Sequence, residues 1–234
     1  MAIYKNTPPI ITNGLVLNLD AANVKSYPGT GTTWSDLSGN SNTGTLTNGP
    51  TFSRDGGGSI LTNGTNNNIV INNNSTINFT TNFSINCWIN IVSLPRTYLG
   101  ILDKFDGINS NGYAIDIPNG GGGMPTRFRF TVGQGGSFKS VIAISSITLG
   151  QWYHVCGIYD GSFIRIFING VLENTTACTG LITVTSENLI LGGDNVSTLY
   201  ANNRYSVLQL HNRALSASEV QQNYNALKSR FNLS

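Results

Sequence analysis

Short runs of apolar residues recur along the chain from Gly14 to His211, and each run is ended by Gly, Asn, Asp or Pro. This rhythm is typical of antiparallel strands in a β-sandwich or β-barrel. Within residues 83–91 the odd positions are apolar and the even positions are polar, apart from Trp88, so one face of that strand belongs to a core. The pattern predicts strands over residues 15–19, 83–91, 98–102, 127–132, 152–159, 163–168, 189–191 and 205–210.

Two dipeptides predict tight hairpins in the second half of the chain. Asp160-Gly161 and Asn169-Gly170 accept the positive φ angles that such turns require. We therefore expect residues 152–159, 163–168 and 171–173 to form a meander of neighbouring strands. The Asn-rich stretch 63–78 and the Gly-rich stretch 119–123 fall between apolar runs and are predicted to be loops.

Helical periodicity occurs only at the C-terminal end. Ser216 followed by Glu219 fits a capping box, in which each residue satisfies a backbone group of the other at the start of a helix. Apolar residues then follow on one face: Val220, Tyr224, Leu227 and Phe231. The sequence predicts a helix over residues 216–230 that docks on the sandwich.

Residues 1–13 differ from the rest of the chain. Pro8-Pro9 prevents this segment from folding as a helix, and four apolar residues flank the two prolines. We expect an extended N-terminal arm that anchors the domain, residues 14–234, to a neighbouring subunit. The anchor residues are Ile3, Tyr4, Ile10 and Ile11.

Composition narrows the range of partners. The 234 residues are 39% hydrophobic, enough for one sizeable core, but only 10% are charged and the net charge is +2. Without a basic stripe the chain lacks the means to bind nucleic acid, and no apolar run is long enough for membrane insertion. Three cysteines cannot pair completely, and all are interpreted as free thiols.

Several motifs occur in one order along nearly the whole chain, from about Gly14 to Phe231. They are WSDLSGNSN at 34–42, FSINCWI at 83–89, WYHV at 152–155, FINGV at 167–171, LGG at 191–193 and HNRALSASEV at 211–220. Together they resemble the concanavalin A-like jelly rolls of the laminin-G-like group. The resemblance implies an all-β fold with two antiparallel sheets, closed here by one C-terminal α-helix.

Three further segments are similar to versions of this module in tailed-phage virion proteins: residues 17–23, 26–34 and 223–228. The same module also occurs in bacterial surface and secreted proteins. A chain that starts with Met and shows no export signal fits the virion, after synthesis in the host cytoplasm. The family often has an Asp about five residues before the final Asn-Arg-Ala-Leu; here residues 205–208 are Tyr-Ser-Val-Leu, which puts a ligand role at that position in doubt.

The acidic residues do not match a glycoside hydrolase. Glucanases of this fold need paired carboxylates on one strand, whereas Asp103, Asp106 and Asp116 do not follow that spacing. His154 and His211 lack the surroundings of a catalytic triad. The sequence therefore predicts a non-enzymatic protein.

Metal binding has one candidate site. Asp36, Ser38, Asn40 and Asn42 place side-chain oxygens at alternate positions around a glycine, which is a spacing that loops use to bind calcium. Because the closing glutamate of a full calcium loop is absent, the alternative is a tight turn whose side chains bind their own backbone. Calcium is the candidate ion, and we predict no other cofactor.

Carbohydrate recognition needs an aromatic ring against a sugar face together with amide and hydroxyl partners. The aromatic candidates in loops are Tyr27, Tyr98 and Tyr200, with Asn195 as an amide partner; each tyrosine has packing at the core edge as its alternative. Trp34, Trp88 and Trp152 are predicted to be core residues.

The preferred hypothesis is a structural protein of a phage virion, on the capsid surface or a tail fibre, that presents a lectin-like domain. Its expected partners are other virion proteins, further copies of itself and a glycan of the host surface. The alternatives are a free-standing or cell-surface lectin and, less favoured, a glycoside hydrolase.

Overall fold

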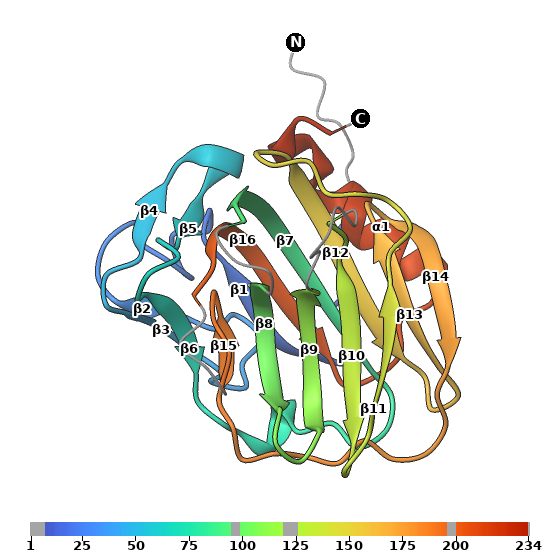
Figure 1. Cartoon of the computed structure of the whole chain (residues 1–234). Helices are drawn as coiled ribbons and strands as arrows, with labels where there is room; N and C mark the ends of the chain where they lie inside the picture. The colour runs from blue at the N-terminus through green and yellow to red at the C-terminus, as the bar shows by residue number, and fades with distance from the viewer. Residues whose placement is uncertain (1–7, 95–98, 119–125, 196–199, 234) are drawn as a thin grey trace.

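The structure is a computed structural model that describes residues 8–94, 99–118, 126–195 and 200–233. Two antiparallel β-sheets pack face to face, and a C-terminal α-helix lies outside them (Figure 1). This arrangement confirms the predicted jelly-roll sandwich.

The first sheet has the strand order β14-β13-β12-β7-β16-β5-β4, and β1 pairs with the second half of β16. Its long central strands, β7 and β16, bring the middle and the end of the chain together. The strands are β1 (Leu15–Asp20), β4 (Thr51–Ser53), β5 (Ser59–Leu61), β7 (Phe83–Ser93), β12 (Trp152–Tyr159), β13 (Phe163–Ile168), β14 (Val171–Ala177) and β16 (Asn202–His211).

The second sheet has the order β11-β10-β9-β8-β15-β6-β3-β2. Its strands are β2 (Thr33–Trp34), β3 (Gly44–Thr47), β6 (Asn68–Ile71), β8 (Leu99–Asp106), β9 (Asn111–Ile117), β10 (Arg129–Gln134), β11 (Phe138–Ile142) and β15 (Leu189–Leu191).

Each of the eight predicted strands corresponds to a strand of the fold, but the prediction of a continuous loop at 63–78 was wrong. Strand β6 lies inside that stretch, because Ile69 and Ile71 alternate with outward residues and are fully buried. The predicted loop at 119–123 lies outside the described residues.

Both predicted hairpins are present in the meander β12-β13-β14. Asn169 and Gly170 adopt φ angles of 51° and 80°, so the turn has left-handed backbone at both central residues. At the other turn the Asp160 carboxylate accepts hydrogen bonds from the backbone of Ser162 and Phe163.

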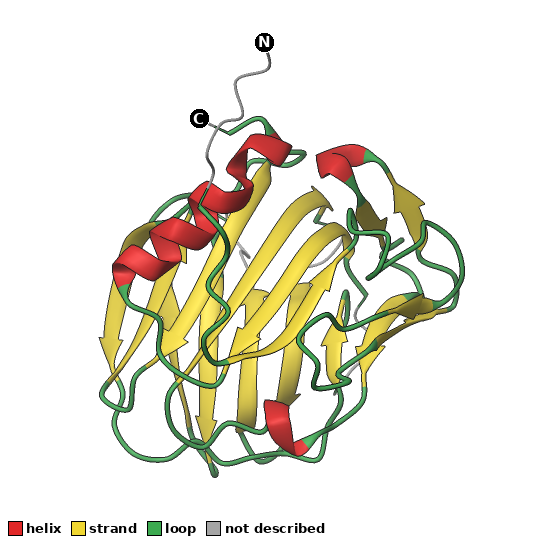
Figure 2. Cartoon of the chain, turned by 180° about the vertical axis from the view of Figure 1, so that it is seen from behind, coloured by secondary structure: helices red, strands yellow, loops and turns green. Residues whose placement is uncertain are grey.

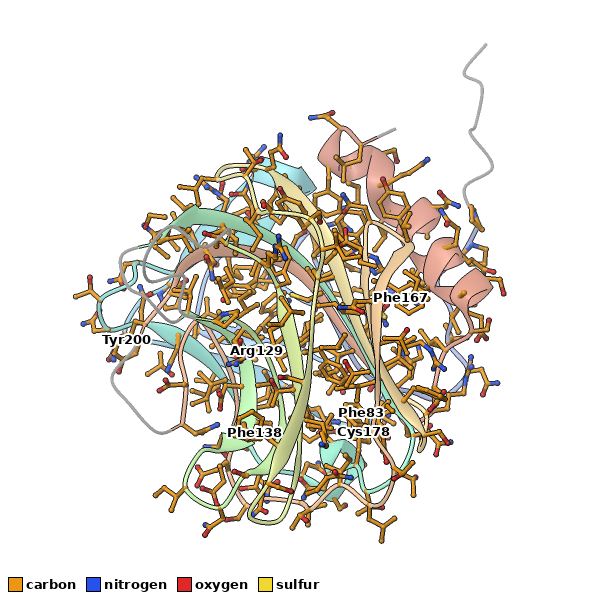
Figure 3. The ribbon with its side chains drawn as sticks, turned by 45° about the vertical axis from the view of Figure 1, so that its right-hand side comes forward. Phe83, Arg129, Phe138, Phe167, Cys178 and Tyr200 are labelled. Carbon is orange, nitrogen blue, oxygen red and sulfur yellow. The ribbon has the colours of Figure 1, made fainter. Side chains whose placement is uncertain are left out.

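The inner faces of the two sheets share one apolar core. Phe83, the first residue of β7, belongs to this core, with its ring close to those of Phe79, Tyr113 and Phe130. The interior position of Phe83, and of Cys178 beside it, can be followed in Figure 3. The three cysteines are buried and free, as predicted.

The outer face of the first sheet is covered by α1 (Ala217–Leu227) and the 3-10 turn η3 (Lys228–Phe231), seen from behind in Figure 2. Ser216 and Glu219 form the predicted capping box. Trp88 breaks the alternation of β7 because its ring points outward into this layer, where it packs against Tyr224 and Phe231. Phe167 faces the same helix farther along the sheet (Figure 3).

The described part of the N-terminal arm docks on its own domain. The backbone N–H of Ile11 donates to Asn223 Oδ1 at 2.7 Å, and the Ile11 carbonyl lies 3.0 Å from His211 Nε2. The side chain of Ile11 packs against the apolar cluster that includes Leu215 and Val220. Ile11 thus contacts its own domain and Ile10 is half-buried, while Ile3 and Tyr4 lie outside the described residues, so the anchor role of the arm stays a prediction.

The outermost strands of the two sheets, β11 and β14, approach each other on one side of the sandwich. The Glu173 carboxylate of β14 accepts hydrogen bonds from the backbone of Ile144 and Ser145, just beyond β11. Asn174 donates to the carbonyl of Ile142 at 2.9 Å. These bonds connect the two sheets at their edges.

None of the helices in the described ranges combines the length and the apolar character of a membrane span.

Candidate functional site

A surface pocket of about 460 Å³ opens where the chain leaves β1 and where β4 ends. We call it the Tyr27–Phe52 pocket. Its lining residues are Ala21, Ala22, Val24, Tyr27, Pro28, Gly29, Phe52, Arg54 and Gly57. Residues 21–29 form one wall, and the hairpin from β4 into the 3-10 turn η1 (Asp55–Gly57) forms the other.

The two walls meet through aromatic and backbone contacts. The rings of Tyr27 and Phe52 lie 5.7 Å apart at an angle of 39°. Tyr27 is fixed because its hydroxyl donates to the Gly31 carbonyl at 2.8 Å. At Gly58 a Cβ atom would lie 2.7 Å from the Cα of Ala22, so only glycine allows the second wall to come this close.

Tyr27 is therefore part of the pocket, although only 4% of its surface is exposed. Its ring is buried, and the half-buried ring of Phe52 packs beside it. Burial raises the pKa of the Tyr27 hydroxyl, which stays a neutral hydrogen-bonding group.

The charged residues around the pocket are largely paired. Arg230 makes a bidentate contact with Asp20, with distances of 2.9 and 3.0 Å. Asp55 accepts from the Trp152 indole at 3.3 Å and lies 3.4 Å from Arg204. Arg54 is exposed on the pocket wall.

A second group of polar residues lies on the outer face of the second sheet. Asp103 on β8 pairs in register with Ala114, two residues before Asp116 on β9, so the two carboxylates are diagonal neighbours on one face. Asp116 makes a bidentate ion pair with Arg129, at 2.8 and 3.0 Å. The structure thus brings together two acidic residues that are 13 positions apart in the sequence.

Asp103 is 3% exposed, and burial raises the pKa of its carboxyl to about 7. The Asn195 amide donates to its Oδ1 at 2.8 Å, which opposes the shift without cancelling it. Asn195 also donates to the Asn188 carbonyl, so this predicted sugar-binding amide is directed inward.

Tyr200 is not among the residues that line the pocket. It is half-buried just before β16, and Figure 3 shows it well separated from Arg129 of the second polar group. Tyr98 lies outside the described residues.

The turn at residues 36–42 is held by hydrogen bonds. The Asp36 carboxylate accepts from the backbone of Asn18, Ser38 and Asn42 and from the Ser38 hydroxyl, all within 2.9 Å. Asn40 donates to the Ser38 hydroxyl. Donors therefore occupy both oxygens that a calcium ion would need, and this geometry favours the turn interpretation.

Asn42 extends this turn to its neighbours. Its side chain donates to the Val16 carbonyl at 2.7 Å and to the Thr76 hydroxyl at 2.9 Å. Among the described residues, no three His, Cys, Asp or Glu side chains gather in a way that would hold a metal ion.

His154 and His211 are both fully buried on the outer face of the first sheet. The ring of His154 lies 5.2 Å from that of Trp88, and burial lowers the pKa of His154 to about 3. These surroundings keep the imidazole neutral and fit a packing role.

Sequence reasoning missed Phe52 and Arg54. Phe52 is the middle residue of the three-residue strand β4 and Arg54 directly follows it, and so short a strand carries too few positions for alternation to be visible. The sequence signal that was available is the Gly56-Gly57-Gly58 run, which indicates an unusual backbone path next to them.

The fold matches solved structures at low sequence identity. The binding domain of Paraclostridial Mosquitocidal Protein 1 is similar with a TM-score of 0.71 and 18% identity over 92% of this chain. The binding domain of Botulinum Neurotoxin DC in complex with SialylT has a TM-score of 0.69 and 16% identity, again over 92% of this chain. This chain spans 52% of each of those two.

A third similar structure is a single domain of comparable size. Domain 4 of AbnA, a GH43 extracellular arabinanase from Geobacillus stearothermophilus, in complex with arabinotriose, has a TM-score of 0.69 and 18% identity. The match covers 90% of this chain and 98% of that domain. No curated protein sequence gave a significant match.

The sequence itself matches a family model. Residues 63–221, well over half of the chain, fit the model of the concanavalin A-like lectin/glucanases superfamily. The match includes most strands of both sheets and the start of α1. The chain therefore belongs to the concanavalin A-like lectin/glucanases superfamily.

Proposed function

We propose that this chain is a non-enzymatic carbohydrate-binding domain of a phage virion, and that the Tyr27–Phe52 pocket is its glycan site. The observation that carries the binding role is the pocket itself, a concave site with an aromatic wall on a rigid sandwich. Its volume lies within the range of about 300–1,000 Å³ that is usual for small-ligand sites. Domain 4 of AbnA, similar in fold and in size, is known in complex with arabinotriose, which supports a saccharide as the ligand.

The pocket offers what a sugar ring needs. The apolar face of a pyranose packs on an aromatic ring, which Phe52 presents beside the fixed Tyr27. Pro28 and Ala22 add apolar surface, while the polar groups of residues 27–31 and of Arg54 lie at the rim. Because Tyr27 is held by its hydrogen bond to Gly31, ligand binding costs little ordering of the site.

The binding test uses a glycan array with the purified chain, followed by calorimetry on the glycans that bind. Phe52→Ala should abolish binding, because it removes the exposed part of the aromatic wall. The matched control is Phe138→Ala, which truncates an exposed phenylalanine on β11 at the opposite edge of the sandwich. A variant at Phe52 that binds as well as the wild type would refute the assignment of the site.

The virion setting rests on the sequence motifs at residues 17–23, 26–34 and 223–228 that are similar to tailed-phage proteins. Mass spectrometry of purified particles would detect the chain at a fixed copy number if it is a structural component. Absence from particles, together with glycan binding, would favour the alternative of a free-standing or cell-surface lectin.

A glycoside hydrolase is the less favoured alternative, and the observation in its favour is that Asp103 and Asp116 share one sheet face. Near neutral pH the raised pKa of Asp103 keeps a proton available on its carboxyl, as a general acid requires, while Asp116 is held by Arg129. We expect no release of reducing ends from β-glucans or arabinans by the purified chain. Turnover that is lost in Asp103→Asn would establish the hydrolase instead.

A further inference from the structure

We infer that the Tyr27–Phe52 pocket takes an acidic saccharide, whose sugar ring packs on Phe52 and whose carboxylate pairs with Arg54. This inference rests on the proposed function and adds the class of ligand. Two observations carry it: the pairing of the arginines and the balance of charge around the pocket.

Most arginines of the described chain already have a carboxylate partner. Ion pairs within 4.0 Å hold five of them: Arg129, Arg165, Arg204, Arg213 and Arg230. Within the described ranges no such pair is found for Arg54 and Arg127, and of these two only Arg54 lines the pocket, although Asp55 is its neighbour in sequence. Asp55 is directed instead toward Arg204 and the indole of Trp152.

The local charge balance is positive. Arg54, Arg204, Arg230 and Lys25 carry four positive charges, and Asp20 and Asp55 carry two negative charges, so the sum is +2. Arg230 and Arg204 are committed to these two carboxylates, which leaves Arg54 as the charged group among the lining residues and Lys25 beside it in the wall of residues 21–29. A ligand carboxylate would pair with Arg54.

The composition of the walls explains why the anion would be carried on a sugar. Apart from Arg54, the lining residues are uncharged, and most are apolar or aromatic. A free inorganic anion would gain nothing from those walls, whereas a sugar acid uses both the aromatic surface and the guanidinium. Arginine suits this role because its fork of N–H groups matches both oxygens of a carboxylate.

The experiment compares matched acidic and neutral saccharides by calorimetry: glucuronic acid against glucose, and sialyllactose against lactose. In the wild type we expect the acid of at least one pair to bind about tenfold more tightly or better, which corresponds to about 1.4 kcal/mol. The preference should decrease when salt is raised from about 50 mM to about 500 mM, because Arg54 is exposed.

Four variants locate the effect. Arg54→Gln should bring acid and neutral sugar to within about twofold of each other, whereas Arg54→Lys should keep part of the preference. Phe52→Ala should weaken both sugars. Lys139→Gln removes an exposed positive charge from β11, on the other side of the sandwich, and should change neither affinity.

The outcomes separate this inference from the proposed function. Equal binding of acidic and neutral sugars, both lost in Phe52→Ala, would overturn the acidic ligand and leave the glycan site standing. An acid preference that persists in Arg54→Gln would overturn the role of Arg54. If no saccharide binds the wild type, both proposals fail. Circular dichroism of each variant verifies folding, which Arg54→Gln should not disturb because its side chain is exposed.

Discussion

The ring of Trp88 lies stacked on the ring of Phe231, with centroids 4.1 Å apart and planes inclined by 12°. One residue belongs to the central strand β7, and the other ends the 3-10 turn that follows α1. Trp152 packs against the same phenylalanine at 4.8 Å. The last residues of the chain therefore complete a second apolar layer on the outside of the first sheet.

Truncating the Phe231 side chain should destabilise the whole domain. Phe231→Ala removes a buried ring from between two tryptophans, and we expect the free energy of unfolding to fall by about 3 kcal/mol. Urea denaturation followed by tryptophan fluorescence measures this loss. Leu181→Ala serves as the control, because Leu181 is largely exposed and its truncation should cost almost nothing. Equal stability of the two variants would mean that the C-terminal turn does not hold the sheet.

Asp103 should make stability depend on pH. Its pKa is raised to about 7 by burial, so between about pH 4 and pH 7 the folded state keeps a proton that the unfolded state loses. This term makes the folded state less stable as pH rises through that window. Asp103→Asn should remove the term and be more stable than the wild type by roughly 3 kcal/mol at pH 8. Urea titrations at several pH values measure the difference, and parallel profiles for both proteins would contradict the burial of a protonated carboxyl.

His154 should change the pH dependence of stability in the opposite direction, so that the folded state becomes less stable as pH falls. Burial lowers its pKa to about 3, so below about pH 6.5 the unfolded state takes up a proton that the folded state refuses. The groups that face it from the neighbouring elements are Trp88, Asn169 and Tyr224, and none of them carries a charge. The wild type should therefore lose free energy of unfolding between pH 7 and pH 4, and His154→Phe should lose less, by on the order of 2–3 kcal/mol. A constant difference across this range would show that the imidazole titrates normally in the folded protein.

The N-terminal arm should contribute to stability. Ile11 packs against the apolar cluster that includes Leu215 and Val220, and its backbone bonds to Asn223 and His211. Deletion of residues 1–13 should lower the free energy of unfolding by about 2 kcal/mol, whereas deletion of residues 1–7 keeps these contacts and should be neutral. Thermal unfolding of the two truncated proteins distinguishes them. If both match the full chain, the docking of Ile11 is not significant in solution.

The alternation of β7 was sufficient to place its inner face in the core, whereas Trp88, predicted to be a core residue, lies in a second apolar layer on the outer face. That layer could be anticipated because the C-terminal helix carries Tyr224 and Phe231 on one face. Strands β3, β6, β9 and β11 were not predicted, since they have only four to seven residues and lie beside loop-like Asn, Thr and Gly residues or between turns. Pairing with neighbouring strands gives them their structure, and such pairing is not visible in a local pattern.

The candidate site was harder to predict than the fold. Tyr27 was identified as a loop aromatic, but its partner Phe52 lies 25 positions later on a strand of three residues. The pairing of Asp103 with Asn195 and of Asp116 with Arg129 likewise depends on how strands are ordered in the sheet. The types of side chain in the sequence suggested which chemistry was possible. Which side chains contact one another depends on the order of the strands, which only the structure gives.

The bonds from Glu173 and Asn174 to the segment around β11 have a consequence for colloidal behaviour. Free β-edges recruit strands from other molecules and seed fibrils, and here the two neighbouring edges engage each other. Large apolar side chains nearby, such as those of Val171 and Ile144, are exposed. Because the strand edges beside them are already occupied, these side chains do not lie next to a free edge on which a cross-β fibril could grow. Glu173→Ala removes the hydrogen bonds to Ile144 and Ser145 and should free these strand edges. We therefore expect this variant to aggregate on storage while its core stays folded.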